Sequence, residues 1–454
     1  MPTPKKLNTE LVECIKIPME FFKRSIREND IVQVLKIRSF LFLMLSEFFS
    51  QVAFNMQHFV IIFIIYEITK SNTAVSGLIL SFIIPAVIFS FIAGVYVDRW
   101  EKRKVLLATN VIRGILILLF FLAGTNIALM YLLTFLIAVT TQFFLPAEAP
   151  MIPLLINKNL LVAANAVFAI GIYSTIFIGY IFSGPALIFL GRTNTFLFLA
   201  LFFFISAIFI QFITRIKKKE TQNIDLSNNF NFSVKNEIKE VLLFIRKAKK
   251  VTNALFVITF AQAIIFTLAV LGPGYVATIL NTQVEDLSWI FLAPAAFGMI
   301  VGSLTLGSLA KKVKNSSSIS IGFLLSGLVL MFLPVGTRVA SQGFVQTINS
   351  YLPHVLVINI LHIIVVLAFL LGFANSLIFV PANTTIQSET HEELRGRIYG
   401  FLNAFVAAIS FLPVALAGTL SDVLGIGRVL TGVGVMILVI GLFRLFKSVN
   451  YIKR

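Results

Sequence analysis

The chain of 454 residues has few of the side chains that form disulfides and metal sites. It contains one cysteine, Cys14, so no internal disulfide can form, and its four histidines lack the spacing of a metal site. We therefore expect no metal and no cofactor. Charge is scarce as well, because Asp, Glu, Lys and Arg together make up 13% of the residues.

The motifs of common enzymes are also missing. No G-x-x-x-x-G-K-[ST] sequence is present to bind ATP phosphates, and no G-x-S-x-G sequence is present to carry a nucleophile. The histidines at 58, 354, 362 and 391 are too dispersed to form a catalytic group. We predict that the protein is not an enzyme, with a membrane enzyme, a scramblase or a non-transporting membrane scaffold as alternatives.

Apolar sequence is abundant. Hydrophobic residues make up 58% of the chain and the mean hydropathy is +0.95, more than a water-soluble globule could cover with polar surface. A helix crosses a bilayer core of about 30 Å with roughly 20 apolar residues, and twelve runs meet that requirement. We predict an all-α membrane protein with spans at 40–68, 74–97, 105–124, 127–146, 161–190, 195–215, 251–280, 288–310, 319–337, 355–380, 398–424 and 427–446.

Positive charge is distributed unevenly among the loops. Only Lys70, Arg192, Arg338 and Arg428 fall in the loops of one side, while the other Lys and Arg residues, apart from Arg113 inside the third span, fall on the opposite side. Loops rich in Lys and Arg remain in the cytoplasm. We therefore predict that both termini are cytoplasmic and that the protein is a multi-pass protein of the cell membrane, plasma or inner.

A basic segment at 234–250 holds many of these charges, and the formal net charge of the chain is +17. Nucleic acid is one conceivable partner, but no aromatic platform for stacking bases accompanies the segment. A basic helix beside a membrane more commonly contacts anionic headgroups. We expect anionic membrane lipids as partners and no nucleic acid.

The two halves of the chain resemble each other. The same offset in residue number relates Arg38 to Val251 and Gly94 to Gly307, and the motif F-x-P-A occurs at 144–147 and 379–382. Two parallel six-helix repeats follow from this pattern. The predicted organisation is a cytoplasmic extension at 1–37, a six-helix bundle at 38–215, a cytoplasmic basic linker at 216–250, a second six-helix bundle at 251–446 and a cytoplasmic tail at 447–454.

The segment GVYVDRWEKRK at 94–104 resembles the loop signature of the major facilitator superfamily, G-x-L-x-D-R-x-G-R-[RK]-[RK]. FFLPAEAPMIPLL and FVPANTTIQSETHEELRGRIYGFLNA are similar to the branch with macrolide-efflux and siderophore-export proteins. The resemblance implies the major facilitator fold of two six-helix repeats. Tyr96 and Glu101 depart from the signature, and Lys311 replaces Asp98 in the second copy.

The resemblance also places the start of span 11 beside Asp98. A carboxylate is favourable at the positive end of a helix, and glycines let two helices approach closely. We expect a latch that forms only when the cytoplasmic ends are shut, and a plain topology anchor is the alternative. The gating residues would be Gly94, Asp98, Arg99, Lys102, Arg103 and Lys104 in the loop and Gly396, Arg397 and Gly400 in span 11.

Four polar residues of span 1, Glu47, Gln51, Asn55 and His58, share one helical stripe because they are spaced by four, four and three. Glu47 lies about 14 Å along the helix from its start, near the middle of the bilayer, where a carboxylate is costly. We predict that it faces the bundle interior and carries protons. His58 is a second proton candidate or an interfacial histidine, and Gln51 and Asn55 line the pathway or pack between helices.

Further polar residues lie in other spans. Any of them could line the substrate pathway or serve packing: Gln142, Gln262, Asn359 and His362. Arg113, two turns into span 3, is expected to extend its side chain to the cytoplasmic surface.

These observations together predict a secondary-active transporter. The leading hypothesis is proton-coupled export of a small amphipathic compound, such as a drug, a macrolide or a siderophore-like molecule, by alternating access. An uptake symporter on the same fold is the alternative. The expected partners are the small-molecule substrate, protons as coupling ion and anionic lipids, and a monomer is favoured.

Overall fold

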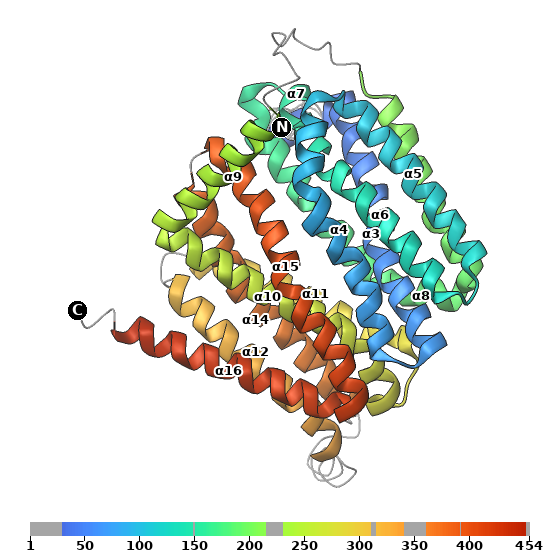
Figure 1. Cartoon of the computed structure of the whole chain (residues 1–454), viewed down its shortest axis with the longest axis vertical. Coiled ribbons are helices and arrows are strands. Elements are labelled where there is room, and N and C mark those ends of the chain that lie inside the picture. The colour runs from blue at the N-terminus through green and yellow to red at the C-terminus, as the bar shows by residue number, and fades with distance from the viewer. Residues whose placement is uncertain are drawn as a thin grey trace, which may run out of the picture.

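The structure, a computed structural model, describes residues 30–148, 150–214, 230–309, 315–339, 360–390 and 392–450. Within these ranges the chain is helical and contains no strand (Figure 1). The predicted extension up to residue 29, the first part of the linker at 215–229, Lys311, Asn359 and the last four residues lie outside them. An all-α chain is the expected solution, because lipid cannot satisfy unpaired backbone groups and a helix pairs them internally.

The helices of the first half follow the predicted spans closely. After a short helix α2 (Asp30–Lys36), they are α3 (Arg38–Thr69), α4 (Asn72–Arg99), α5 (Lys102–Ala123), α6 (Ile127–Glu148), α7 (Met151–Leu155) and α8 (Leu161–Gln211). A 3₁₀ turn, η1 (Lys158–Leu160), precedes α8.

The second half begins with the linker helix α9 (Phe230–Lys247). It continues with α10 (Lys249–Tyr275), the π-helix η2 (Val276–Leu280), the 3₁₀ turn η3 (Val284–Asp286), the π-helix η4 (Ser288–Leu292), α11 (Ala293–Leu309), α12 (Asn315–Val339), α14 (Ile360–Glu389), α15 (Glu392–Leu424) and α16 (Ile426–Asn450).

Eleven helices in the described ranges are long and apolar enough to cross a membrane. The longest element, α8, has 51 residues, roughly 75 Å of straight helix and more than twice the thickness of a bilayer core. It is interrupted at Gly191, whose φ of 70° is a conformation that residues with a side chain rarely adopt. This break separates the two runs that the sequence predicts at 161–190 and 195–215.

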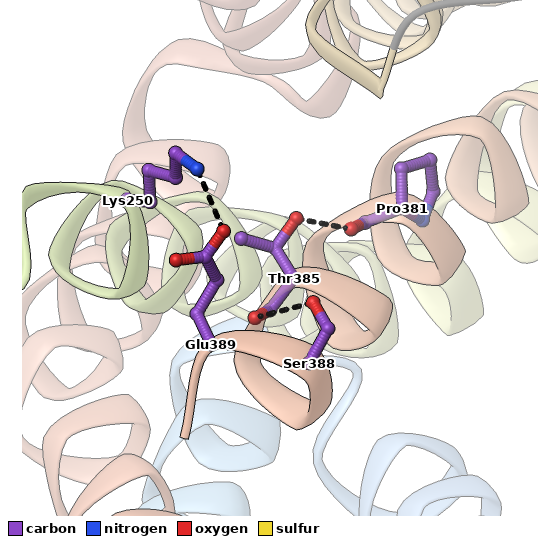
Figure 2. A network of polar contacts seen from close by, with 5 residues as sticks. All are labelled: Lys250, Pro381, Thr385, Ser388 and Glu389. Carbon is purple, nitrogen blue, oxygen red and sulfur yellow. Dashed lines mark hydrogen bonds and ion pairs between the residues drawn. The ribbon is translucent and has the colours of Figure 1, made fainter. Parts of the chain in front are cut away.

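Helix α14 continues past the predicted end of its span at residue 380, through the polar sequence up to Glu389. The Thr385 hydroxyl donates to the Pro381 carbonyl at 2.8 Å, and Lys250 at the start of α10 lies 2.7 Å from the Glu389 carboxylate (Figure 2). Local hydrogen bonds and this ion pair give the polar turns their partners. A hydropathy criterion misses such turns because they lie beyond the apolar run.

Close helix contacts occur at glycines. A methyl group at Gly372 of α14 would overlap the backbone of Ala295 in α11, and one at Gly327 of α12 would lie 2.7 Å from the Leu438 amide nitrogen of α16. Small residues at such crossings allow backbones to approach, which is how helices gain contact energy inside lipid. The helices of the second half are therefore closely packed at these crossings.

The two halves meet at one end. We call the end where α3 begins and α4 finishes the inner end, following the charge prediction, and the opposite end the outer end. In Figure 1, α4 and α15 converge toward the lower edge, which is the outer end. There the Ser76 hydroxyl of α4 donates to the Val414 carbonyl of α15, and the Ser183 hydroxyl of α8 lies 3.0 Å from that of Ser288 in η4.

The inner end differs from the outer end. A methyl group added at Gly94 of α4 or at Gly400 of α15 would meet no atom within 4 Å. Methyl groups at Gly184 and Gly418, by contrast, would overlap residues of the opposite half at the outer end. The described helices thus adopt a conformation that is closed at the outer end, with the predicted Gly94 and Gly400 contact unformed.

The glycine crossings predict a specific pattern of stability. Gly372→Ala should destabilise the protein by roughly 1–3 kcal/mol, because the new methyl group must displace the Ala295 backbone. Gly432→Ala in α16, where no atom lies within 4 Å, is the control and should be neutral or slightly stabilising. Melting temperatures of the purified variants in detergent measure both. Equal melting temperatures would contradict the role of the crossing.

Candidate functional site

Two carboxyl groups meet inside the first half. Glu47 of α3 is 3% exposed and Glu148 at the end of α6 is 5% exposed, and the two carboxyl groups lie close enough to interact electrostatically. Two carboxylates buried close together repel each other, and a proton on one of them removes that repulsion. The pair therefore provides a place to hold a proton between two membrane helices.

Arg113 of α5 supplies the positive charge next to this pair. Its side chain is completely buried and interacts electrostatically with both Glu47 and Glu148. The expectation that Arg113 reaches the cytoplasmic surface is wrong. A guanidinium remains in the interior when carboxyl groups and hydrogen-bond acceptors surround it there, because they compensate for the loss of water.

Four other residues fix the Arg113 guanidinium in place. Its Nη2 donates to Asn110 Oδ1 at 2.7 Å and to Ser50 Oγ at 3.0 Å. The Phe144 and Phe203 rings flank the guanidinium carbon, with ring centres at 4.1 and 4.9 Å. Aromatic faces attract a desolvated cation. Helices α3, α5, α6 and α8 all contribute to this cluster, which we call the Arg113 cluster and which comprises Glu47, Ser50, Asn110, Arg113, Phe144, Glu148 and Phe203.

Some polar atoms of the cluster keep spare bonding capacity. The Ser50 hydroxyl donates to Asn110 Oδ1 at 2.9 Å, while Oε1 of Glu47, Oε1 of Glu148 and Nδ2 of Asn110 have no partner among the described residues. Two carboxyl groups beside one guanidinium can exist with different numbers of protons. One of the two carboxyl groups can therefore gain or lose a proton while the Arg113 guanidinium beside it stays in place.

The four polar residues of the predicted stripe on α3 do not all contact one another. Gln51 lies one turn after Glu47 on α3, so these two residues share a face of the helix as expected. The Asn55 amide donates to the Gln51 carbonyl of its own helix at 2.8 Å. His58 Nδ1 lies 2.8 Å from the Phe54 carbonyl, and its ring packs 4.0 Å from the Phe82 ring. Asn55 and His58 thus bond to their own helix, and these hydrogen bonds do not reach the carboxyl pair.

The remaining pathway candidates are dispersed. Gln142 is half-buried on α6, where its amide donates to the Ala138 carbonyl at 3.4 Å. Gln262 is half-buried on α10, and His362 is exposed on α14. Asn359 lies outside the described residues. The contacts of the three described residues do not place them in the Arg113 cluster.

Three basic residues at the loop between α4 and α5 make contacts that stabilise the neighbouring helix ends. Arg103 donates to the carbonyls of Ile210 and Gln211, and so caps the end of α8. Lys104 pairs with Glu101 at 2.8 Å. Lys102 donates to the Val97 carbonyl at the end of α4. The side chains of Asp98 and Arg99, and Gly396 as a packing position, lie outside the described part of the structure.

Arg397, a predicted gate residue, contacts the linker helix. It pairs with Glu240 of the linker helix α9 at 2.8 Å. This contact joins α9 to α15 within the second half. The gating role of Arg397 stays a prediction, whereas its contact to the linker is a feature that the sequence did not indicate.

Glu148, Asn110 and Ser50 escaped the sequence reasoning. Glu148 follows the predicted end of span 4 and reads as part of a polar loop, but α6 continues through Pro146 to include it. One signal was available. An arginine well inside a span needs acidic partners at a similar depth, and Glu47 and Glu148 were the acids near the spans that could supply them.

Two helical halves, the first of which contains a buried charge cluster, can be compared with known families of membrane proteins. The sequence profile described as Major Facilitator Superfamily matches residues 43–412. The chain belongs to the Major Facilitator Superfamily. This confirms the resemblance of the segment at 94–104 at the level of the family.

Similar proteins extend over nearly the whole chain. The uncharacterized MFS-type transporter YkuC of Bacillus subtilis is 24% identical over 442 residues, which cover 91% of this chain and 93% of YkuC. The uncharacterized MFS-type transporter YfmI of the same organism is 20% identical and covers 88% of this chain and 94% of its own. The multidrug efflux pump Tap of Mycolicibacterium fortuitum is 23% identical over 178 residues, 39% of this chain and 37% of Tap.

Solved structures show the same fold. A point mutant of the nucleoside transporter NupG superposes with a TM-score of 0.69 at 12% identity, covering 89% of this chain and 99% of NupG. A POT family transporter in complex with a thioalcohol-conjugated peptide also gives a TM-score of 0.69, at 13% identity, covering 91% and 96%. Membership of the superfamily indicates a multi-pass membrane transporter for small molecules, as predicted, and not an enzyme.

The charge balance of the Arg113 cluster can be tested by stability. Arg113→Met leaves both Glu47 and Glu148 buried without a cation and should destabilise the protein by about 3–5 kcal/mol. Adding Glu47→Gln and Glu148→Gln to Arg113→Met removes all three charges and should restore most of the stability. Melting temperatures in detergent measure this. A triple variant no more stable than Arg113→Met would assign the loss to packing against the two Phe rings.

Proposed function

We propose that this member of the superfamily is a secondary-active exporter that exchanges protons for a small amphipathic compound by alternating access. The observation that carries the proposal is the buried pair of acids, Glu47 and Glu148, which interact electrostatically with each other and with the buried Arg113. Intramembrane ionisable groups are costly and mark ion pathways. A shared proton between two helices is a coupling device that needs no cofactor.

Arg113 gives the coupling a physical basis. When the pair loses its proton, two carboxylates face one guanidinium, and the attraction between Arg113 and Glu148 strengthens as the repulsion between the two acids grows. Protonation reverses this balance. Because α3, α5 and α6 each carry one of these charges, the preferred packing of the three helices depends on proton occupancy. A proton moving down a potential of 100 mV supplies about 2.3 kcal/mol for such a change.

Export is favoured over uptake by similarity. Tap is a multidrug efflux pump, and the motifs at 143–155 and 379–404 resemble the macrolide-efflux and siderophore-export branch. An uptake symporter is the second candidate. Accumulation of a fluorescent amphipathic dye such as ethidium separates them, because an exporter lowers accumulation in cells and a protonophore abolishes the difference.

The proposed topology has twelve crossings with both termini in the cytoplasm, in the plasma or inner membrane. Gly191 supports the number, since it divides α8 into two runs that are each long enough to span. The two six-helix bundles would be 38–215 and 251–446, joined by the linker at 216–250 and flanked by cytoplasmic segments. A monomer contains both halves of the transport path.

The linker helix α9 is proposed to contact anionic lipids. Leu242 and Leu243 are each 48% exposed, while Lys239, Arg246 and Lys247 on the same helix are exposed. Apolar and basic side chains together on an exposed helix favour a negatively charged membrane surface. The Glu240 and Arg397 pair would hold α9 against α15 at that surface.

The coupling proposal predicts the behaviour of Glu47→Gln. The amide keeps the size and hydrogen bonding of the carboxyl group but cannot exchange a proton. The variant should still bind the dye and allow downhill exchange, but it should lose uphill export driven by a pH gradient in proteoliposomes. Glu67→Gln, at the exposed outer end of α3 where Glu67 pairs with Arg192, is the control and should transport normally. Normal uphill export by Glu47→Gln would exclude Glu47 as the carrier.

The proposed inner latch predicts the behaviour of Asp98→Asn. A neutral side chain interacts less well with a helix start, so closure of the inner end should weaken by about twofold to thirtyfold and transport should fall. Insertion should be normal because the basic residues remain. A cysteine at Asn403, exposed and on the same face of α15 as Gly396 and Gly400, should become more accessible to a maleimide. Glu101→Gln is the control, and identical accessibility in Asp98→Asn and wild type would leave Asp98 an ordinary loop residue.

A further inference from the structure

Asp422 joins the two halves at the outer end, away from the Arg113 cluster. It lies in the last turn of α15, and its carboxylate accepts hydrogen bonds from the first residues of α4 in the other half. The Ser71 hydroxyl donates at 2.6 Å, the Asn72 backbone at 2.9 Å, and the Thr73 backbone and hydroxyl at 2.9 and 2.7 Å. The Asn72 amide adds a fifth contact at 3.1 Å.

These contacts form a helix cap made by a residue of another helix. The first N–H groups of any helix have no partner within it, and a carboxylate is especially favourable there because of the helix dipole. Here the carboxylate belongs to the opposite half. Any separation of the halves at the outer end therefore removes the acceptor of the Asn72 and Thr73 N–H groups and leaves the Asp422 charge without its donors, while Ser71 still caps the Ala74 N–H.

The helix surfaces beside Asp422 also fit closely. Gly418, one turn before Asp422, lies where a methyl group would overlap Ser76 and the backbone of Asn72. A methyl group at Gly274 of α10 would lie 2.6 Å from Ile426 and would also overlap Asn72. The Asp422 side chain itself is exposed, and the close packing beside it holds its carboxylate against the start of α4.

The sequence repeats this arrangement at the opposite end. Gly418 and Asp422 are four residues apart at the end of α15, and Gly94 and Asp98 are four residues apart at the end of α4. Helices α4 and α15 pack side by side with opposite directions, so each aspartate lies at the end where the other helix starts. In this conformation the outer pair is engaged, while a methyl group added at Gly94 would meet no atom within 4 Å.

We propose that Asp422 and Gly418 form an outer latch that alternates with Gly94 and Asp98 at the inner end, so that each helix caps the other at one end at a time. The proposal rests on the alternating access of the proposed function but not on proton coupling or on the direction of transport. One latch must open before the other closes. The balance between the two sets the populations of the conformations.

The test measures the accessibility of a buried cysteine without substrate or pH gradient. Val414 of α15 is completely buried, and its carbonyl accepts the Ser76 hydroxyl, so Val414→Cys reports on the outer contact. The background carries Cys14→Ser, and the protein is held in lipid nanodiscs that expose both faces to a hydrophilic maleimide. Asp422→Asn should raise the labelling rate by about threefold to thirtyfold, the range expected for a lost charged cap.

Two further variants separate a latch from local fraying of α4. Asp286→Asn is the control. Asp286 lies at the same end of the molecule, but its carboxylate accepts a hydrogen bond from the backbone N–H of Gln283 in its own turn η3. It should leave the labelling rate unchanged. Asp98→Asn combined with Asp422→Asn weakens both latches and should return the rate toward that of the unmutated reporter, since the outer-open state loses its own cap.

Two results would overturn the proposal. Equal labelling of Asp422→Asn and the unmutated reporter would show that Asp422 does not hold the outer end. A double variant that labels as fast as Asp422→Asn alone would show that the start of α4 frays locally and that the two ends do not alternate. Neither result depends on transport, so a failure of proton coupling remains distinguishable.

Discussion

Helices in lipid gain nothing from hiding apolar surface, because the surrounding chains are as apolar as the helices. This bundle therefore depends on contacts that need short distances: backbones brought together at glycines, and polar groups that have found partners away from water. Gly372 against Ala295 is an example within one half. Gly418 against Asn72 is an example between the halves, and it forms at only one end of the molecule in this conformation.

The same constraint explains why charge is concentrated in one place. A lone guanidinium or carboxylate would be costly in the bilayer interior, yet Arg113, Glu47 and Glu148 occur together on three helices. Their mutual compensation makes each of them tolerable, while the second carboxyl group leaves room for a proton. A structural ion pair would need only one acid. The additional acid is the reason we propose a role in proton coupling for this cluster.

Much of the architecture could be predicted because membrane helices are specified by local composition. The span predicted at 40–68 corresponds to α3 (Arg38–Thr69), and that at 398–424 ends at the same residue as α15. Contacts across helices are not local, and there the reasoning was weaker. The depth of Glu47 was visible in the sequence, but the position of Glu148 depended on α6 continuing through Pro146, and the burial of Arg113 depended on three other helices. Asp422 resembles an ordinary loop residue until α4 is placed beside it.

The tight turn at Gly191 has a mechanical consequence. It connects the two arms of α8 without a flexible loop, so the arms transmit force to each other through a single residue. The first arm carries Ser183 and Gly184, which touch the second half at Ser288, and the second arm carries Phe203, which covers the Arg113 guanidinium. Through this one residue, the hairpin connects the contact surface of the two halves to one wall of the buried charge cluster.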